Sequence, residues 1–233
     1  MRLGISVGAA AACAVAVAPA AAAPRVEQLV AYRNGDAKQR LVRAAGVKAR
    51  VGSKRCAVAP GTPLAALLRA GLPGIKLKDY GQCSSKPADA AGLYVSRIRK
   101  DAAKGASGWV YKVGNKVGTA GAADTSGPFG SGRLEPGVRV TWFYCHMRAN
   151  GCQRTLGIKP KAIGGGQVRV TVRSYDDGGK AKLVAGATVR SGTVSARTDG
   201  KGVATLTLSP GAARVEATAN GLVRSFQEPI DVK

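Results

Sequence analysis

The chain has 233 residues, enough for two ordinary domains, and its 36 Lys and Arg against 13 Asp and Glu give a formal net charge of +23 at pH 7. Aromatic residues make up only 5%, whereas 32 Gly and 11 Pro indicate many turns and a β-rich chain. The single histidine, His146, has no serine or acid placed beside it by a known motif, which argues against a triad enzyme.

Residues 1–23 predict a secretory signal peptide. One Arg precedes a run of small apolar residues that ends in four alanines, which fits an A-x-A cleavage site. A transmembrane anchor is the alternative, because the run is about long enough to span a bilayer, but its Ala-rich composition favours cleavage. We therefore expect a protein that is secreted, extracellular or attached to the cell wall, with no transmembrane segment once the signal is removed.

The first strands predicted after the signal are Val26–Tyr32 and a partner around Gln39–Arg43. A clearer hairpin follows, with Val47–Val51 and Lys54–Val58 on either side of the turn Gly52-Ser53. Basic and apolar residues alternate along it, so the basic ones are expected on the outward face. Such residues usually solvate a sheet face or protect its edge. They are also the candidate anion-binding residues of the chain: Lys48, Arg50, Lys54 and Arg55.

One short helix is predicted after this hairpin. Thr62 can cap it, Pro63 suits the first helical position, and Gly71 ends it. Its leucines Leu64, Leu67 and Leu68 form one apolar stripe and are expected in the core. Leu93–Ile98 predicts the next strand.

Two aromatic strands follow. Read with period two, Trp109, Tyr111 and Val113 share one face of the first strand, and Val138, Val140, Trp142 and Tyr144 share one face of the second. Aromatic side chains that face each other across strands favour pairing, so we expect the two strands to be neighbours in one sheet.

The loop 119–133 between these strands is rich in Gly, Ala and Ser, and loops of this length are often functional or mobile. Asp124 is its only acid and Phe129 its only aromatic residue. We expect Phe129 to anchor the loop in the core rather than to contact a ligand. If the protein binds a small molecule, the candidate ligand loop comprises Trp109, Tyr111, Asp124 and Phe129.

Residues 160–166, with three consecutive glycines, are predicted to be a linker. Beyond it the alternation is regular: Val168, Val170 and Val172 face in, while Arg169 and Arg173 face out. Short strands separated by Asp-Gly, Pro-Gly and Asn-Gly turns then predict a small antiparallel β-sandwich over 167–233.

Four cysteines remain after the signal, an even number in an oxidising compartment. Three pairings are possible, and we favour Cys56–Cys83 and Cys145–Cys152 because each closes a short local loop. His146 beside Cys145 matches no usual zinc spacing, and the acids Asp176 and Asp177 suit a turn as well as a calcium loop. No metal site and no cofactor is expected.

The pattern Gly-Trp-x-Tyr-x-Val from Gly108, a Gly-rich loop, and Val-x-Trp-x-Tyr-Cys ending at Cys145 resembles the transcobalamin-type β-grasp domain of secreted bacterial proteins of unknown function. This chain has Val113-Gly114-Asn115 where that family has Val-Asn-Gly, and Pro136-Gly137 where it has Gly-Asp. Both departures keep a turn in place. The resemblance implies a β-grasp domain over 24–159 and says little about a ligand.

A second resemblance lies in the C-terminal part, in the segments 186–189, 198–202, 204–211 and 217–221. They are similar to the carboxypeptidase-regulatory-like, or prealbumin-like, fold, whose members serve as appended non-catalytic scaffolds. The fold class expected for the chain is therefore mostly β with one short helix, an α+β β-grasp-like domain followed by a small Ig/prealbumin-like β-sandwich.

Charge is distributed unevenly between the two expected domains. Residues 24–165 hold 25 Lys and Arg against 7 acids, a net charge of +18, and residues 166–233 hold 10 against 6, a net charge of +4. This asymmetry favours an exported, non-enzymatic binding or structural module at the cell envelope, whose basic domain contacts an anionic polymer. The ordinary alternative is that the charge only keeps the protein in solution.

A small-ligand, corrinoid-like binding protein is the second hypothesis, because the first resemblance suggests it. Extracellular nucleic acid is a third possibility, but it is not expected, because aromatic residues are few and sit at inward-facing strand positions, so no stacking platform is evident. The sequence identifies no protein partner and no oligomeric state.

Overall fold

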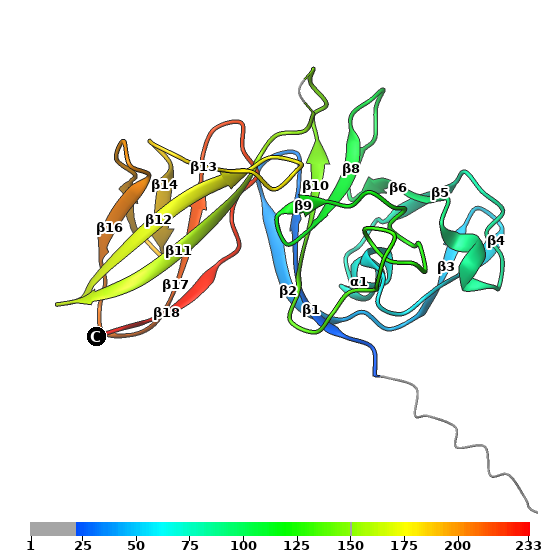
Figure 1. The fold of residues 1–233 in the computed structure, drawn as a ribbon, viewed down its shortest axis with the longest axis horizontal. Helices are drawn as coiled ribbons and strands as arrows, with labels where there is room; N and C mark the ends of the chain where they lie inside the picture. The colour runs from blue at the N-terminus through cyan, green and yellow to red at the C-terminus, as the bar shows by residue number, and fades with distance from the viewer. Residues whose placement is uncertain (1–21, 150) are drawn as a thin grey trace, which may run out of the picture.

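The computed structural model describes residues 22–149 and 151–233, and it is mostly β with one short α-helix, as predicted (Figure 1). Two lobes lie side by side, the first formed by β1 to β10 and the second by β11 to β18. Nearly all of the predicted signal peptide, residues 1–21, lies outside the described part. Among the residues described, no helix is long and apolar enough to cross a membrane.

The first lobe is built on a five-stranded sheet in the order β2-β1-β10-β8-β9. Its central strands β1 and β10 are parallel and the remaining pairs are antiparallel. The strands are β1 (Arg25–Ala31), β2 (Ala37–Arg43), β8 (Gly108–Val113), β9 (Lys116–Val117) and β10 (Arg139–Cys145).

The two aromatic strands pair as predicted, with Trp142 opposite Tyr111 and Tyr144 opposite Trp109. Six of the seven residues of β10 are buried. A strand that is apolar almost throughout has both faces covered, unlike one that alternates between core and solvent. Here one face meets the helix and the smaller sheets, and the other meets the second lobe.

The helix α1 (Pro63–Arg69) begins where predicted. Thr62 Oγ1 accepts a hydrogen bond from the amide of Ala65 at 3.2 Å, and Gly71 follows the helix with a φ of 65°. Leu64 and Leu67 are fully buried in the core of the first lobe, as expected from the leucine stripe.

Two smaller sheets complete this lobe. The predicted basic hairpin forms a two-stranded sheet of its own, and three further strands pair as β5-β6-β7. The elements are β3 (Val47–Val51), β4 (Lys54–Val58), β5 (Lys76–Asp79), the 3-10 helix η1 (Pro87–Ala90), β6 (Leu93–Ile98) and β7 (Asp101–Ala102).

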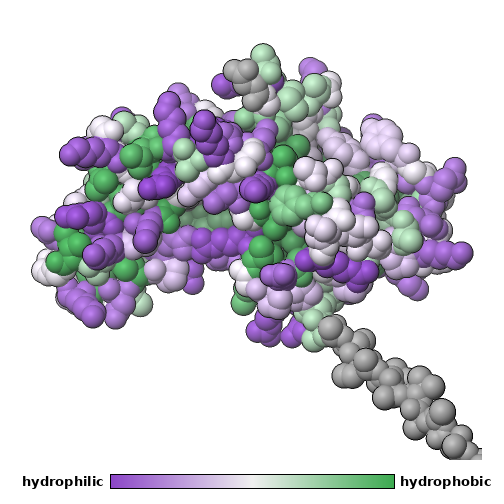
Figure 2. Space-filling view, in the orientation of Figure 1, coloured by the Kyte–Doolittle hydropathy of each residue, from purple (hydrophilic) through white to green (hydrophobic). Residues whose placement is uncertain are grey.

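The second lobe is a sandwich of two four-stranded sheets around a small aliphatic core. In one sheet β12 lies between β11 and β13 and also pairs with β16, and the other has the order β15-β14-β17-β18. The strands are β11 (Thr155–Gly164), β12 (Gln167–Tyr175), β13 (Ala181–Leu183), β14 (Thr188–Ser191), β15 (Val194–Arg197), β16 (Val203–Thr207), β17 (Gly211–Thr218) and β18 (Glu228–Val232). Val168, Val170 and Val172 are fully buried, as their alternation predicts. Hydrophilic side chains cover much of the visible face of this lobe in Figure 2.

The segment 160–166 is not a linker, and this prediction was wrong. Lys159 to Ala162 pair with β12 residue by residue, and the glycines 164–166, all with positive φ, make the turn between β11 and β12. Pro160 is tolerated because β11 is an edge strand, where a missing N–H breaks no inner ladder. Lys159 and Lys161 therefore belong to the second lobe. With the boundary placed after Arg154, the first lobe carries 23 cations against 7 acids and the second 12 against 6.

The lobes are joined by a packed interface. Ala31, Phe143 and Cys145 on the far face of the central sheet pack against Val223 of the second lobe. Beside this cluster the fully buried Lys112 donates from Nζ to the carbonyls of Tyr175, at 3.0 Å, and Asp176, at 2.8 Å.

Two carboxylates of the second lobe also reach across the interface. Lys112 Nζ lies 3.5 Å from Asp177 Oδ1, and Arg139 is paired with Glu228 as well as with Glu27 of its own lobe. Burial lowers the pKa of Lys112, and the Asp177 carboxylate opposes that change. The interface is thus held by ionic groups as well as by apolar contact.

Candidate anion-binding surface

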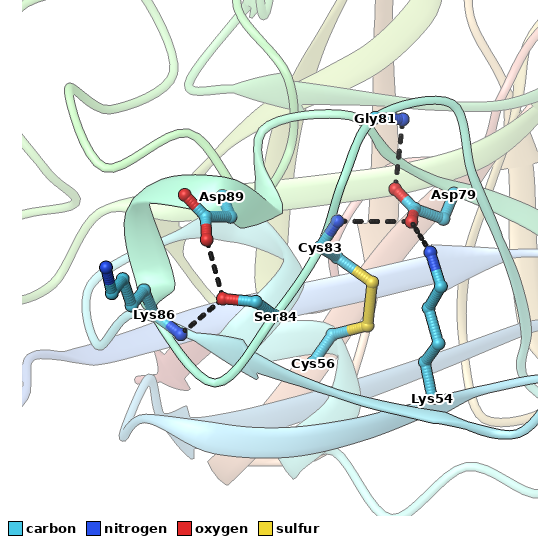
Figure 3. Close-up of a disulfide and its surroundings, with 8 residues drawn as sticks. All are labelled: Lys54, Cys56, Asp79, Gly81, Cys83, Ser84, Lys86 and Asp89. Carbon is cyan, nitrogen blue, oxygen red and sulfur yellow. Dashed lines mark hydrogen bonds and ion pairs between the residues drawn. A yellow bond between two sulfur atoms is a disulfide. The ribbon is translucent and has the colours of Figure 1, made fainter.

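Both disulfides form with the favoured pairing, Cys56–Cys83 and Cys145–Cys152. The first ties β4 to the loop after β5, and the second closes the loop that follows β10. Figure 3 shows the first bond beside the Asp79 carboxylate, which accepts hydrogen bonds from the amides of Gly81 and Cys83. Two disulfides are compatible with an extracellular protein.

Three of the four candidate anion-binding residues share the outward face of the β3–β4 hairpin. Arg50 lies directly opposite Arg55 across the two strands, and Lys48 lies two residues before Arg50 on the same face. All three side chains are exposed, and none forms an ion pair within the described residues. Because like charges directly opposite each other destabilise a sheet, this face gains from a nearby anion.

Lys54, the fourth candidate, does not belong to this face. It lies opposite Val51 at the tip of the hairpin, and its Nζ is 3.4 Å from Asp79 Oδ2 (Figure 3). Burial acts to raise the pKa of Asp79, but the amides of Gly81 and Cys83 and the Lys54 ammonium outweigh it, so the pKa is lowered. Lys54 therefore connects the hairpin to β5.

The candidate ligand loop is held by bonds within the protein. Trp109 Nε1 donates to the carbonyl of Asp101 at 2.8 Å, and Tyr111 Oη donates to the carbonyl of Ala120 at 2.7 Å. The carboxylate of Asp124 accepts from the amide of Ser126 inside its own turn. Phe129 is 39% exposed, so the expectation that it anchors the loop in the core was wrong.

Alanine takes the anchoring role that was expected of Phe129. Ala122 and Ala123 are buried, and the carbonyl of Ala122 accepts a hydrogen bond from the amide of Leu64 at the start of α1. The small side chains of these alanines let the loop approach the helix closely. The sequence analysis missed this role because it looked for a large residue as the anchor.

Beside this loop lies an apolar hollow of about 390 Å³. Its walls include both tryptophans and three tyrosines: Tyr80, Tyr94, Trp109, Tyr111 and Trp142.

Tyr80 is a surface residue that the sequence reasoning missed. It is 74% exposed, its ring centroid lies 6.1 Å from that of Tyr94, and it lines a groove of about 720 Å³. Three cations line that groove: Lys76, Lys78 and Arg97. The alternation Lys-Leu-Lys-Asp-Tyr from Lys76 was the available signal, because it indicates a strand with a basic outer face.

In residues 22–149 and 151–233, no group of three or more His, Cys, Asp or Glu side chains is placed to hold a metal ion. The ring of His146 packs against the ring of Tyr144, with centroids 5.1 Å apart, and its backbone amide donates to Gln153. This histidine directly follows β10 and lies within the loop closed by the Cys145–Cys152 disulfide.

Comparisons with protein-family models, with curated proteins and with solved structures found no match to this chain.

Proposed function

We propose that this protein is an exported, non-enzymatic binding module of the cell envelope whose first lobe holds an anionic polymer. The observation that carries the proposal is the exposed Arg50–Arg55 pair, with Lys48 beside it and no carboxylate engaging them in the described chain. A cation pair placed face to face favours release of counterions when a polyanion binds.

The distribution of ion pairs supports the same surface. Of the 23 cations of the first lobe, four form ion pairs within the described chain: Lys54, Lys112, Arg139 and Arg154. Most of its cations therefore have no carboxylate partner among the described residues. Where such cations lie close together, their mutual repulsion opposes folding. The predicted signal peptide fits an exported protein. The parallel central strands and the packed helix are in keeping with the β-grasp resemblance, which also fits an exported domain.

The test is salt-dependent retention of the protein on isolated cell envelopes and on alginate. Reversing Lys48, Arg50 and Arg55 to Glu should weaken retention at low salt and lower the slope of log affinity against log salt by about 2. Retention that is unchanged in this triple variant would disprove the proposal.

The second lobe offers a matched control. Lys161 on β11 lies directly opposite Arg169 on β12, with Lys159 two residues away, and all three side chains are exposed. Reversal of these three residues changes the net charge by the same amount in the same kind of site. A loss of retention equal to that of the hairpin variant would show that overall charge, and not the hairpin, governs binding.

The apolar hollow is the observation that favours the second candidate function, binding of a small molecule. At about 390 Å³ it lies at the small end of ligand pockets, which run to about 1,000 Å³, and this size is far too small to enclose a corrinoid. An unchanged cobalamin spectrum on addition of the protein would eliminate the corrinoid version.

A further inference from the structure

The groove on the β5-β6-β7 sheet combines aromatic and cationic side chains. Lys76 and Lys78 lie two residues apart on β5, and both side chains are exposed, as is that of Arg97 on β6. The residues that line this groove include no acid, and these three cations form no ion pair within the described chain.

Tyr80 is exposed, yet its backbone is held firmly. Its amide donates to the carbonyl of Gly92 at 3.0 Å, and a Cβ on Gly92 would lie only 2.7 Å from the amide nitrogen of Gly81, so the two segments touch. On either side, Asp79 and Gly81 belong to the hydrogen-bonded turn next to the Cys56–Cys83 disulfide (Figure 3). An aromatic side chain presented from a fixed backbone loses little backbone entropy when it binds a partner.

Tyr94 fixes the other side of the aromatic pair. Its ring lies against Gly108, where a Cβ would come within 2.1 Å of the tyrosine oxygen. Tyr80 and Tyr94 also line the adjoining apolar hollow, so one continuous surface runs from the basic groove past two aromatic rings to an apolar wall.

We propose that this groove binds single-stranded nucleic acid, with phosphates on Lys76, Lys78 and Arg97 and an unstacked base on Tyr80. Positively charged grooves with aromatic rings are the usual construction of sites that bind single strands without sequence preference. The sequence analysis argued against nucleic acid because it placed the aromatic residues at inward-facing strand positions, but Tyr80 is exposed. The inference shares with the proposed function the premise that the first lobe holds a polyanion, and it uses different residues.

An acidic glycan matches the cations equally well but uses the rings less. Every nucleotide of a nucleic acid strand offers a flat base that can stack on the ring of Tyr80. The apolar wall beside the rings can contact a base without hydrogen bonds that depend on the sequence. A duplex keeps its bases stacked inside and offers only phosphates to this surface. Preference for a single strand over a duplex of the same sequence is therefore the signature expected of the groove.

The experiment is fluorescence anisotropy of a labelled thymidine oligonucleotide titrated with the protein. Tyr80→Ala should weaken binding roughly 5- to 150-fold with the salt slope unchanged, whereas Tyr80→Phe should retain the affinity. Replacing Lys76 and Lys78 by Gln should lower the slope of log affinity against log salt by about 1.4, because two phosphate contacts are lost. The matched control replaces Lys159 and Lys161 by Gln, and thermal melting checks that each variant is folded.

Two results would overturn the inference. One is equal oligonucleotide affinity of Tyr80→Ala and the unmodified protein. The other is a loss of alginate affinity in Tyr80→Ala as large as the loss of oligonucleotide affinity, which would assign the groove to acidic glycans. Oligonucleotide binding that depends on Lys48, Arg50 and Arg55 but not on Tyr80 would leave the proposed function standing and remove only this inference.

Discussion

The two lobes use their charges differently. In the second lobe four of six acids form ion pairs: Asp176 with Arg154, Asp177 with Lys112, Glu216 with Arg190 and Arg224, and Glu228 with Arg139. In the first lobe only two of seven acids do so, Glu27 and Asp79, and the cations far outnumber them. The acids of the second lobe thus serve its own fold and the interface, while the excess cations of the first lobe face solvent.

The lobes also differ in how they are packed. In the first lobe the central strands of the sheet are covered by aromatic residues and a helix, and both disulfides lie there. The second lobe relies on alternating valines between two sheets. Because the far face of the first lobe's sheet is covered by the second lobe, the first lobe depends on its neighbour more than a chain of independent domains would. Changes at Lys112 and at the disulfides test this dependence, and changes at Glu216 and Tyr111 test each lobe by itself.

The largest effect is expected at the interface. Lys112→Met removes the donor to the carbonyls of Tyr175 and Asp176, and each acceptor that loses its partner costs about 1–3 kcal/mol. The carboxylate of Asp177, which is partly exposed, loses its ion-pair partner as well. Differential scanning calorimetry should show one cooperative transition for the unmodified protein and a strongly lowered melting temperature for the variant. Lys116→Met, an exposed change on the adjacent strand, is the control. Two independent transitions in the unmodified protein would show that the lobes do not support each other.

The disulfides should rank next. Their sequence separations of 27 and 7 residues predict, from chain entropy, losses of about 3.5 kcal/mol for replacing Cys56 and Cys83 by Ala and about 2.5 kcal/mol for Cys145 and Cys152. Urea unfolding measures both double variants. The second bond also lies in the apolar cluster between the lobes, so a loss larger than that of the first bond would mean that Cys145 stabilises chiefly through the interface.

The sequence predicted most elements correctly wherever one physical signal dominated. Period two was sufficient for the strands of Trp109 and Val168, and the sequence Thr62-Pro63 was sufficient for the helix start. The prediction of a linker at 160–166 failed, because three glycines suit a hairpin turn as well as a linker. Pro160 also argued against a strand, although an edge strand such as β11 tolerates proline. The burial of Lys112 was also missed, because no local pattern shows that a second lobe covers that face.

For the candidate site the outcome was divided. The alternation of the hairpin placed Lys48, Arg50 and Arg55 outward, but the ion pair of Lys54 with Asp79 joins residues far apart in the sequence and has no local signature. The groove was missed although Lys76 and Lys78 alternate with Leu77, because the meeting of Tyr80 with Tyr94 depends on the pairing of β5 with β6.

A smaller effect, dependent on pH, is expected in the second lobe. Burial acts to raise the pKa of Glu216, but Arg190, Gln227 and Arg224 outweigh it, so the pKa of the folded state lies below the ordinary value. A carboxyl with a lowered folded pKa contributes stability that is complete above its unfolded pKa and is lost as the pH falls through the folded value. Stability should therefore decline below about pH 4.5. In Glu216→Gln that decline should be shallower, measured by urea unfolding between pH 3 and 7, and an identical pH dependence in both proteins would contradict the assignment.

The smallest effect is expected in the loop 119–133 of the first lobe, which is longer than the turns of the second lobe. Burial raises the pKa of Tyr111 to about 12, so its hydroxyl stays protonated and donates to the carbonyls of Ala120 and Pro128. Tyr111→Phe keeps the ring and removes this donor, which should cost about 1 kcal/mol. Hydrogen exchange should then be faster in 119–133 and unchanged in the second lobe. Tyr80→Phe is the control, because its hydroxyl lies on an exposed ring. Unchanged exchange in Tyr111→Phe would mean that the buried alanines hold the loop without the hydroxyl.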